Sequence, residues 1–210
     1  MSEKIRVLLV DDHALVRRGF RRLMDDDPEI EVVGEASDGA EAIEFIQKLR
    51  PDVIVLDYAL PEQNGALISR KILSLPITAP KILILSMHSE PTYVTNCKLA
   101  GVNGYLLKNA LDLELVEAVK KVMAGEWVLD PRLNQSQDRK FPGKRPLSTR
   151  ELEVLQYIVA GRSNKEIANL LGLSVNTVSV HRANIMDALE IHNTADLVVT
   201  AIRHGLATMP

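Results

Sequence analysis

Residues 53–57 read VIVLD, four apolar residues followed by an aspartate. An apolar run of this length without polar alternation is typical of a strand that is buried on both faces. Helical patterns separate this run from four similar ones. Those runs lie around residues 5–10, 32–33, 82–85 and 105–107. Strands that alternate with helices predict an α/β domain, in which helices cover both faces of a parallel five-stranded sheet.

The rest of the chain divides into a linker and a helical domain. The segment 128–146 holds three prolines among Asn, Gln, Ser and basic residues, which predicts a linker with no element of its own. After it the patterns are all helical. Capping boxes at 148–151 and 163–166 open two helices, and two more begin near 174 and 194. We therefore expect two domains and a linker, at residues 1–127, 147–210 and 128–146.

Composition narrows the class of protein. The net charge is −3, and it is unevenly spread, with 15 Lys+Arg against 20 Asp+Glu in residues 1–127 and 10 against 8 in residues 128–210. This mild asymmetry permits nucleic-acid binding without requiring it. The single Cys97 excludes an internal disulfide and a cysteine-rich zinc site. The chain shows neither a membrane-length apolar run nor the pattern of a signal peptide, which predicts a cytoplasmic protein with no membrane partner.

Reactive side chains follow the predicted strands where each strand ends. Asp11 and Asp12 follow the first strand, Asp57 ends the third, Ser86 follows the fourth and Lys108 follows the fifth. In parallel sheets, ligands bind outside the carboxyl ends of the strands. Each residue alone could be a turn residue, a helix cap or a solvated charge. Because all five stand at matching strand ends, the sequence predicts that they form one site.

This set of groups suits phosphoryl transfer to a carboxylate. Asp12 and Asp57 can bind a hard cation such as Mg²⁺, with Asp11 helping directly or through water. Lys108 can neutralise one phosphoryl oxygen, and the Ser86 hydroxyl can donate a hydrogen bond to another. Asp57 would then be the group that receives the phosphoryl.

Residues 4–125 resemble the receiver domain of two-component response regulators. The resemblance rests on Val10–His13, on Leu56–Pro61 with Gly65, on Ser86, and on Gly104–Lys108. It implies a flavodoxin-like (βα)5 fold and phosphorylation of Asp57 by a sensor histidine kinase. Two positions depart from the common pattern of the family: Leu60 stands where Met is usual, and Asn109 stands where many receivers have proline.

The same resemblance implies roles for the other site residues. Asp11, Asp12, Asp57 and the backbone carbonyl of Ala59 would bind Mg²⁺ or Mn²⁺. Ser86 and Tyr105 would form a switch pair. As Ser86 moves toward the phosphoryl group, it would leave room for the Tyr105 ring to turn inward.

The stretch from residue 163 to 189 predicts helix, glycine-containing turn, helix, which is the layout of a helix-turn-helix. One face of its second helix is apolar and belongs to the core. The opposite face carries small residues that can approach base edges, namely Asn176, Ser179, Val180 and Ala183. Flanking residues could bind phosphates, namely Lys165, Thr177 and Arg182. His181 lies at the core edge, where a core position and a phosphate contact are equally open.

Residues 147–206 resemble the LuxR-type helix-turn-helix of the NarL/FixJ subfamily. The resemblance rests on 147–151, 161–168 and 174–178, with His181, Ile185 and Leu189. It implies a four-helix domain and a transcription regulator that binds paired DNA half-sites as a dimer. Residues 148–210 carry only five Lys+Arg against six acids. One copy should therefore bind DNA weakly, and two joined copies far better.

The last predicted helix, 194–206, has more apolar surface than a small domain needs. Its apolar side chains spread over more than half of the circumference, while about 100° suffices for a surface helix. We expect Val198, Val199 and Ile202 to form a dimer surface on phosphorylation. Before phosphorylation the first domain either covers this surface or leaves it open and acts by promoting dimerisation. The alternative is that the first helix of the same domain covers this face.

Two other functions compete with a phosphorylation-controlled, DNA-binding regulator. A phosphohydrolase with an Asp nucleophile usually has a second Asp two residues later as general acid, and Ala59 stands there. This absence favours a phosphoryl acceptor that is not a turnover enzyme. A protein-interaction module would use the helical domain to bind another protein. The small-residue face of the third helix favours DNA.

Overall fold

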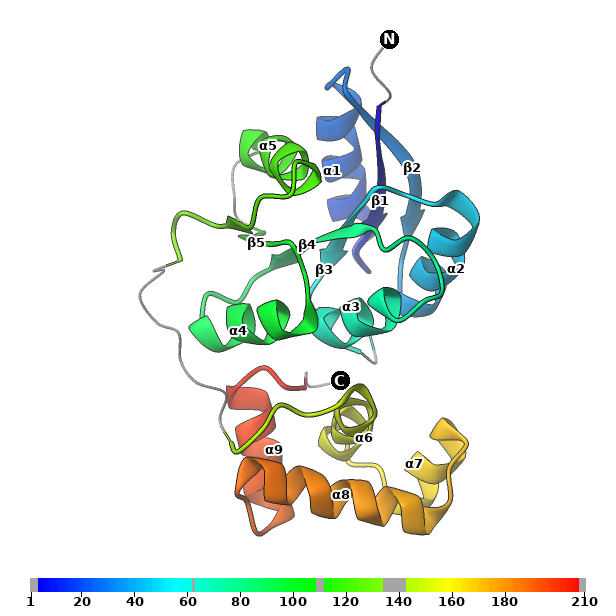
Figure 1. Ribbon diagram of the computed structural model, residues 1–210, viewed down its shortest axis with the longest axis vertical. Helices are drawn as coiled ribbons and strands as arrows, with labels where there is room; N and C mark the ends of the chain where they lie inside the picture. Colours follow the sequence, from blue (N-terminus) through cyan, green and yellow to red (C-terminus); the bar gives the residue numbers. More distant parts are fainter. Residues whose placement is uncertain (1–3, 62, 109–111, 134–142, 208–210) are drawn as a thin grey trace.

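The computed structural model describes residues 4–61, 63–108, 112–133 and 143–207. The chain folds into a receiver-like α/β domain and a helical domain, which pack against each other (Figure 1). In chain order the elements are β1 (Ile5–Val10), α1 (Ala14–Asp25), β2 (Ile30–Ala36), α2 (Gly39–Leu49), β3 (Val53–Asp57), α3 (Gly65–Leu73), β4 (Lys81–Ser86), α4 (Pro91–Ala100), β5 (Gly104–Leu107), α5 (Asp112–Met123), β6 (Val128–Leu129), α6 (Thr149–Val159), α7 (Asn164–Leu171), α8 (Val175–Leu189) and α9 (Thr194–Arg203).

The first domain is a parallel sheet with the strand order β2-β1-β3-β4-β5-β6. Alternate residues of each strand enter two separate cores. Leu8 of β1 packs in a core with Ile46 of α2 and Ile68 of α3, while Leu9 packs in a second core with Val119 of α5. Helices α2, α3 and α4 thus cover one face, and α1 and α5 cover the other (Figure 1). The predicted α/β fold class is confirmed.

The sheet differs from the prediction in having a sixth strand. Val128 and Leu129 pair in parallel with Gly104 and Tyr105 of β5, within a segment that we expected to be linker throughout. The chain then stays attached to the first domain, because Leu133 is 6% exposed and lies in the core beneath α4. The linker prediction is therefore wrong for residues 128–133. Residues 134–142 lie outside the described ranges.

The second domain contains the four predicted helices around one core. Capping boxes open α6 and α7, as predicted, with Ser148 paired to Glu151 and Ser163 to Glu166. Gly172 ends α7 in the left-handed conformation that the turn into α8 requires. The core joins all four helices through Leu155, Ile167, Val178, Ile185 and Leu197. No helix in the described part of the chain is long and apolar enough to cross a membrane.

Candidate functional site

The predicted strand-end residues gather at one edge of the sheet. Because β1, β3 and β5 are parallel, their carboxyl ends bring Asp11, Asp57 and Lys108 together. The Nζ atom of Lys108 lies 2.6 Å from Oδ2 of Asp57 and 2.7 Å from Oδ2 of Asp11. Both carboxylates are almost fully buried, at 2% and 3% exposed. The structure therefore holds two buried carboxylates against a single ammonium.

Burial and charge pairing act against each other in this cluster. Burial raises the pKa of Asp57, and the ammonium of Lys108 only partly opposes this. Burial lowers the pKa of Lys108, but its bonds to Asp11 and Asp57 outweigh burial and raise the pKa above its ordinary value. Lys108 is therefore a cation at neutral pH, and the two carboxyl groups beside it are in excess over this one ammonium.

A divalent cation fits this excess. One ligand atom each from Asp11, Asp12, His13 and Asp57 lies within 4.8 Å of all the others. Three of these donors are carboxylates, the ligands that a hard cation prefers. The acidic cluster can therefore hold a metal ion. His13 was not among the predicted ligands. Its Nδ1 lies 2.6 Å from Oδ1 of exposed Asp12, and its place directly after the two aspartates was the available signal.

The loop after Asp57 is held close to the start of α3. The Ala59 amide donates to Oδ1 of Asp57 at 3.1 Å, and Ala59 forms a bridge with Asn64. A side chain at Gly65 would lie 2.9 Å from the Asp57 carbonyl oxygen, so only glycine permits this approach. Asn64 in turn caps α3 by accepting from the Leu67 amide. The loop that carries Ala59 is thus tied to α3 at both its ends.

Ser86 and Tyr105 lie at the strand positions that the sequence predicts. The orientation of the Tyr105 ring differs from the prediction. Ser86 is 1% exposed and its Oγ accepts a hydrogen bond from the His88 amide. Tyr105 is fully buried, and its hydroxyl donates to the His88 carbonyl at 2.8 Å. The ring therefore already occupies the inward position that we expected it to reach on phosphorylation. Close packing of β4 and β5 against α4 accounts for this, since Tyr105 fills a position in that core.

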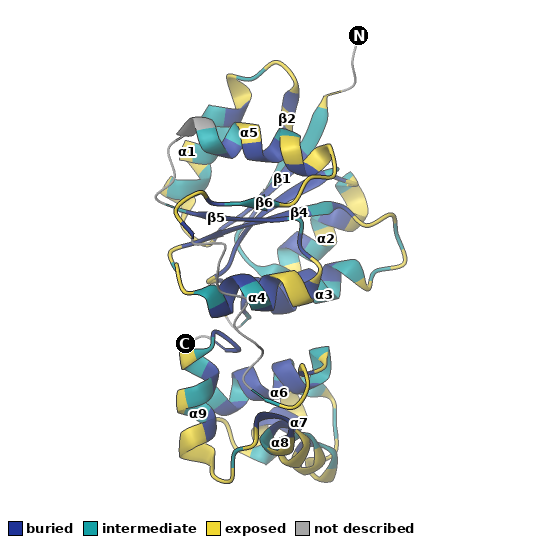
Figure 2. Cartoon of the chain, turned by 60° about the vertical axis from the view of Figure 1, so that its left-hand side comes forward, coloured by how far each residue is buried: buried dark blue, intermediate teal, exposed yellow. Residues whose placement is uncertain are grey.

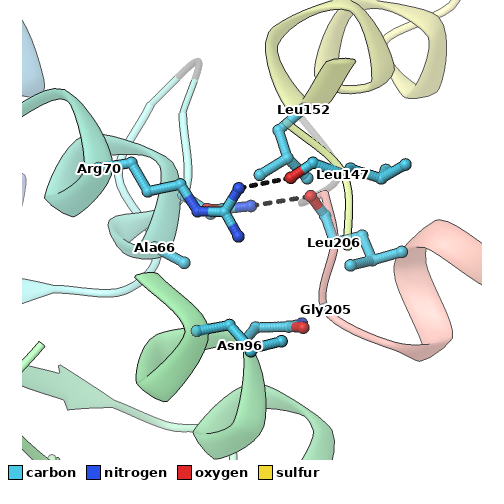
Figure 3. A pocket seen from close by; sticks show the side chains of 9 residues that line it. Ala66, Arg70, Asn96, Leu147, Leu152, Gly205 and Leu206 are labelled. Atoms are coloured by element: carbon cyan, nitrogen blue, oxygen red, sulfur yellow. Dashed lines mark hydrogen bonds between the residues drawn. The ribbon is translucent and has the colours of Figure 1, made fainter. Parts of the chain in front are cut away.

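A second set of polar side chains, which sequence reasoning missed, joins the two domains. Three side chains of the first domain donate to main-chain carbonyls just after α9: Tyr58 to Gly205 at 2.5 Å, Asn64 to Leu206 at 3.1 Å and Asn96 to His204 at 2.6 Å. Arg70 of α3 donates to the Leu147 carbonyl before α6 (Figure 3). Lys71 and Glu153 form an ion pair at 2.7 Å.

The contact between the domains is close-packed. The turn after α9 is buried between them, with Leu206 at 4% exposed (Figure 2). The gap that remains beside Arg70 measures about 10 Å³ (Figure 3), which is room for about one water molecule. Gly205 has a φ of +61°, and a Cβ there would lie 2.7 Å from the Tyr93 ring. Only glycine fits at this point of the interface.

The predicted DNA-contacting face of α8 is open. Val178, Ile185 and Leu189 are buried, whereas Val180 is 51% exposed. The other small-face residues are also exposed, namely Asn176, Ser179 and Ala183. Helix α8 lies on the side of its domain that faces away from the first domain (Figures 1 and 2). The receiver-like domain therefore leaves this face uncovered.

The residues that flank this face differ in exposure and in the hydrogen bonds that their side chains make. Lys165 is exposed. Arg182 and Thr177 are half-buried; Arg182 donates to Asn164 at 3.2 Å and to Thr194 at 3.0 Å, and Thr177 contacts the helix cap Ser174. The Nδ1 atom of half-buried His181 is buried and has no hydrogen-bond partner among the described residues. This environment favours the core-edge position over a phosphate contact for His181.

The predicted dimer surface on α9 is partly exposed. Val199 is 53% exposed, and Val198 and Ile202 are half-buried. The buried face of α9, through Leu197 and Ala201, packs in the core that also contains α6. The first domain contacts the turn beyond α9 and leaves Val199 open. The expectation that it covers this surface is therefore wrong for Val199, because the contact is made by the carbonyls of residues 204–206.

Known proteins match both halves of the chain. Residues 7–120 match the response regulator receiver domain, and residues 145–201 match the bacterial regulatory proteins of the luxR family. The oxygen regulatory protein NreC of Staphylococcus carnosus (strain TM300) is 37% identical over 96% of this chain and 99% of that protein. NreC of Staphylococcus haemolyticus (strain JCSC1435) is 35% identical over the same shares of the two chains.

Solved structures agree with these matches. The response regulator ChrA of a heme-sensing two-component system superposes with a TM-score of 0.55 at 33% identity, over 98% of this chain and all of that one. A structure of two RcsB dimers bound to two parallel DNAs superposes with a TM-score of 0.60 at 26% identity, over 95% of this chain and all of that one. The chain belongs to the two-component response regulators that join a receiver domain to a LuxR-type helix-turn-helix domain, and it is a DNA-binding transcription regulator.

Proposed function

We propose that Asp57 accepts a phosphoryl group from a sensor histidine kinase and that this event controls DNA binding. The observation that carries the proposal is the placement of Lys108, whose ammonium contacts both Asp57 and Asp11 at the carboxyl edge of the sheet. In the transfer, a carboxylate oxygen of Asp57 forms a bond to phosphorus. The P–N bond of the phosphohistidine breaks, and its electron pair returns to the imidazole.

Asp11, Asp12 and Asp57, with the backbone carbonyl of Ala59, would hold Mg²⁺ or Mn²⁺. The cation would offset the charge that builds up as a phosphoryl group approaches a carboxylate. Lys108 balances part of the same charge, and the Ser86 hydroxyl is placed to donate to a phosphoryl oxygen. With Ala59 two positions after the acceptor, where a hydrolase would carry its general acid, we treat the protein as an acceptor and not as a turnover enzyme.

The output of this event is binding to paired DNA half-sites by a dimer, in the cytoplasm. Asn176, Ser179, Val180 and Ala183 would face base edges from α8, and Lys165, Thr177 and Arg182 would lie against phosphates. The acidic balance of residues 148–210 makes a single copy a weak binder. Pairing two copies through Val198, Val199 and Ile202 supplies the missing affinity.

The contact between the domains supplies a route from Asp57 to DNA. Tyr58 follows the acceptor directly, and Asn64 is bridged to Ala59. Both donate to the turn after α9. A change at Asp57 therefore acts on the bonds that fix α9 against the receiver, while α8 is already open. The contact between the domains therefore limits how α9 can pair with α9 of a second copy. It does not cover α8.

The acceptor assignment is tested by intact mass. The full chain is incubated with phosphoramidate and Mg²⁺, and the mass increase of one phosphoryl group is followed over time. Asp57→Asn should take no label. Asp52→Asn is the matched control. Asp52 precedes β3, at the amino-terminal ends of the strands, and accepts a hydrogen bond from the Arg6 amide. Equal labelling of wild type and Asp57→Asn would defeat the assignment.

A further inference from the structure

Asp130 is a fully buried acid in the segment that follows β6. It is 0% exposed, although it stands between a two-residue strand and a proline. Its carboxylate accepts from the Leu107 amide at 2.9 Å and forms a two-pronged ion pair with Arg132, at 2.8 and 2.6 Å. A buried carboxylate is costly unless it is paired and hydrogen-bonded in this way. Neither the proposed phosphoryl transfer nor the proposed DNA contacts require a buried acid at this position.

The side chain of Asp130 continues the sheet where the main chain leaves it. The amides of Val128 and Asp130 donate to carbonyls of residues 103 and 105, as a parallel ladder requires. The next donor on β5 is the amide of Leu107. The main-chain carbonyl of Asp130 is not its partner, because that carbonyl accepts from the Leu133 amide in a turn. The carboxylate takes the place of the carbonyl, so the buried Leu107 amide is satisfied.

Leu107 is the residue before Lys108, so the bond from Asp130 holds the main chain one residue before the lysine of the phosphorylation site. The Lys108 amide is held from the other side by the Ser86 carbonyl at 2.8 Å. The end of β5 is thus fixed by bonds on both of its edges, one from β4 and one from Asp130. Burial raises the pKa of Asp130, but bonds from Arg132 and Leu107 outweigh burial and lower it. The carboxylate is therefore ionised at neutral pH and makes charge-assisted bonds.

We propose that Asp130 is a positioning residue for phosphoryl transfer: it fixes the end of β5 so that the Lys108 ammonium lies between Asp11 and Asp57. This inference rests on the proposed function of Asp57. Without the carboxylate the Leu107 amide loses the acceptor that the described residues give it, and the strand end, with Lys108, is held from the β4 side alone. A displacement on the order of 1 Å can reduce a rate about a hundredfold. Because the bond to the Ser86 carbonyl remains and limits the displacement, the expected loss in Asp130→Ala is smaller, about tenfold.

The test is a double-mutant cycle on the rate of labelling by phosphoramidate with Mg²⁺, in the full chain. In this reaction an Asp57 oxygen–phosphorus bond forms, the P–N bond breaks and ammonia leaves. Asp130→Ala should slow labelling about tenfold, and Asp130→Asn, which keeps an oxygen acceptor for the Leu107 amide, should slow it less. In a Lys108→Ala background, Asp130→Ala should cause no further loss, because it acts through Lys108.

Asp27→Ala is the matched control. Asp27 also accepts from a backbone amide, that of Glu29, and pairs with a cation, Lys120. It precedes β2, at the amino-terminal ends of the strands and away from Asp57. It should leave the labelling rate unchanged. The proposal is overturned if Asp130→Ala labels at the wild-type rate, or if it slows labelling by the same factor with and without Lys108. A wild-type chain that takes no label would overturn the proposed function itself, and this inference with it.

Discussion

The hydroxyl of Tyr58 donates a hydrogen bond to the carbonyl of Gly205, which lies in the other domain. Tyr58 is the residue directly after the proposed phosphoryl acceptor, and Gly205 lies just beyond the helix proposed for dimerisation. This buried bond therefore links the two functional parts of the chain directly. The main chain of Tyr58 is also bonded to the start of α3, since the Gly65 amide donates to the carbonyl of Tyr58.

Tyr58→Phe removes this bond and keeps the ring. A buried hydrogen bond contributes about 1 kcal/mol, a factor of about five in an opening equilibrium. Hydrogen–deuterium exchange at residues 204–207 of the unphosphorylated chain should therefore accelerate about fivefold. Tyr93→Phe is the control, because Tyr93 contacts the same turn through its ring. If the two variants exchange alike at 204–207, the Tyr58 bond does not hold the turn.

Acid should destabilise the helical domain through Glu151. The bonds from Arg145 and Ser148 lower the pKa of Glu151 from 4.5 to about 2. Because the folded-state pKa is depressed, the stabilisation is fully present above pH 4.5 and is lost as the pH falls toward 2. The whole shift would correspond to about 3 kcal/mol, and solvent screening at the half-exposed Arg145 reduces the contribution below this figure. Thermal unfolding of Glu151→Gln should show a correspondingly smaller loss of stability over this pH range, and a curve parallel to wild type would contradict the pairing.

The assignment of Lys165 to phosphates and of Val180 to base edges can be tested on DNA fragments. The fragments are those that the phosphorylated protein selects from genomic DNA. Lys165→Ala should weaken binding to every fragment and lower the salt slope by about one, because Lys165 would neutralise a phosphate. Val180→Ala should change the relative affinities among fragments, since Val180 would contact a base edge. A Lys165→Ala protein with altered sequence preference and an unchanged salt slope would reverse the assignment.

The dimer surface is tested by Val199→Glu. Val199 is 53% exposed in the single chain, so a charge there should not disturb the fold. Cooperative binding to paired half-sites should be lost, while circular dichroism stays that of wild type. Thr200→Glu, on the same helix but outside the proposed surface, is the control. A folded Val199→Glu protein that still binds paired half-sites cooperatively would place the surface elsewhere.

The sequence predicts the acidic edge well because topology determines it. Once the strands are parallel, residues at their carboxyl ends must meet, and Asp11, Asp57 and Lys108 do. Capping boxes are equally local, and those at Ser148 and Ser163 are confirmed.

The interdomain contacts left no comparable pattern. The acceptors of the four hydrogen bonds are main-chain carbonyls, which every residue has, and their donors are 77 to 147 positions away in the chain. The strand β6 was missed because two apolar residues before Pro131 resemble a loop. The inward ring of Tyr105 depends on the space that its neighbours leave, and periodicity carries no information about that space.

A DNA titration shows whether phosphorylation of Asp57 controls DNA binding. A selected DNA fragment with paired half-sites is titrated with wild type and with Asp57→Asn, each with and without prior treatment with phosphoramidate and Mg²⁺. Treatment should make wild-type binding tighter and cooperative, and Asp57→Asn should bind weakly under both conditions. An equal response of Asp57→Asn, or wild-type binding that treatment leaves unchanged, would show that Asp57 does not control DNA binding.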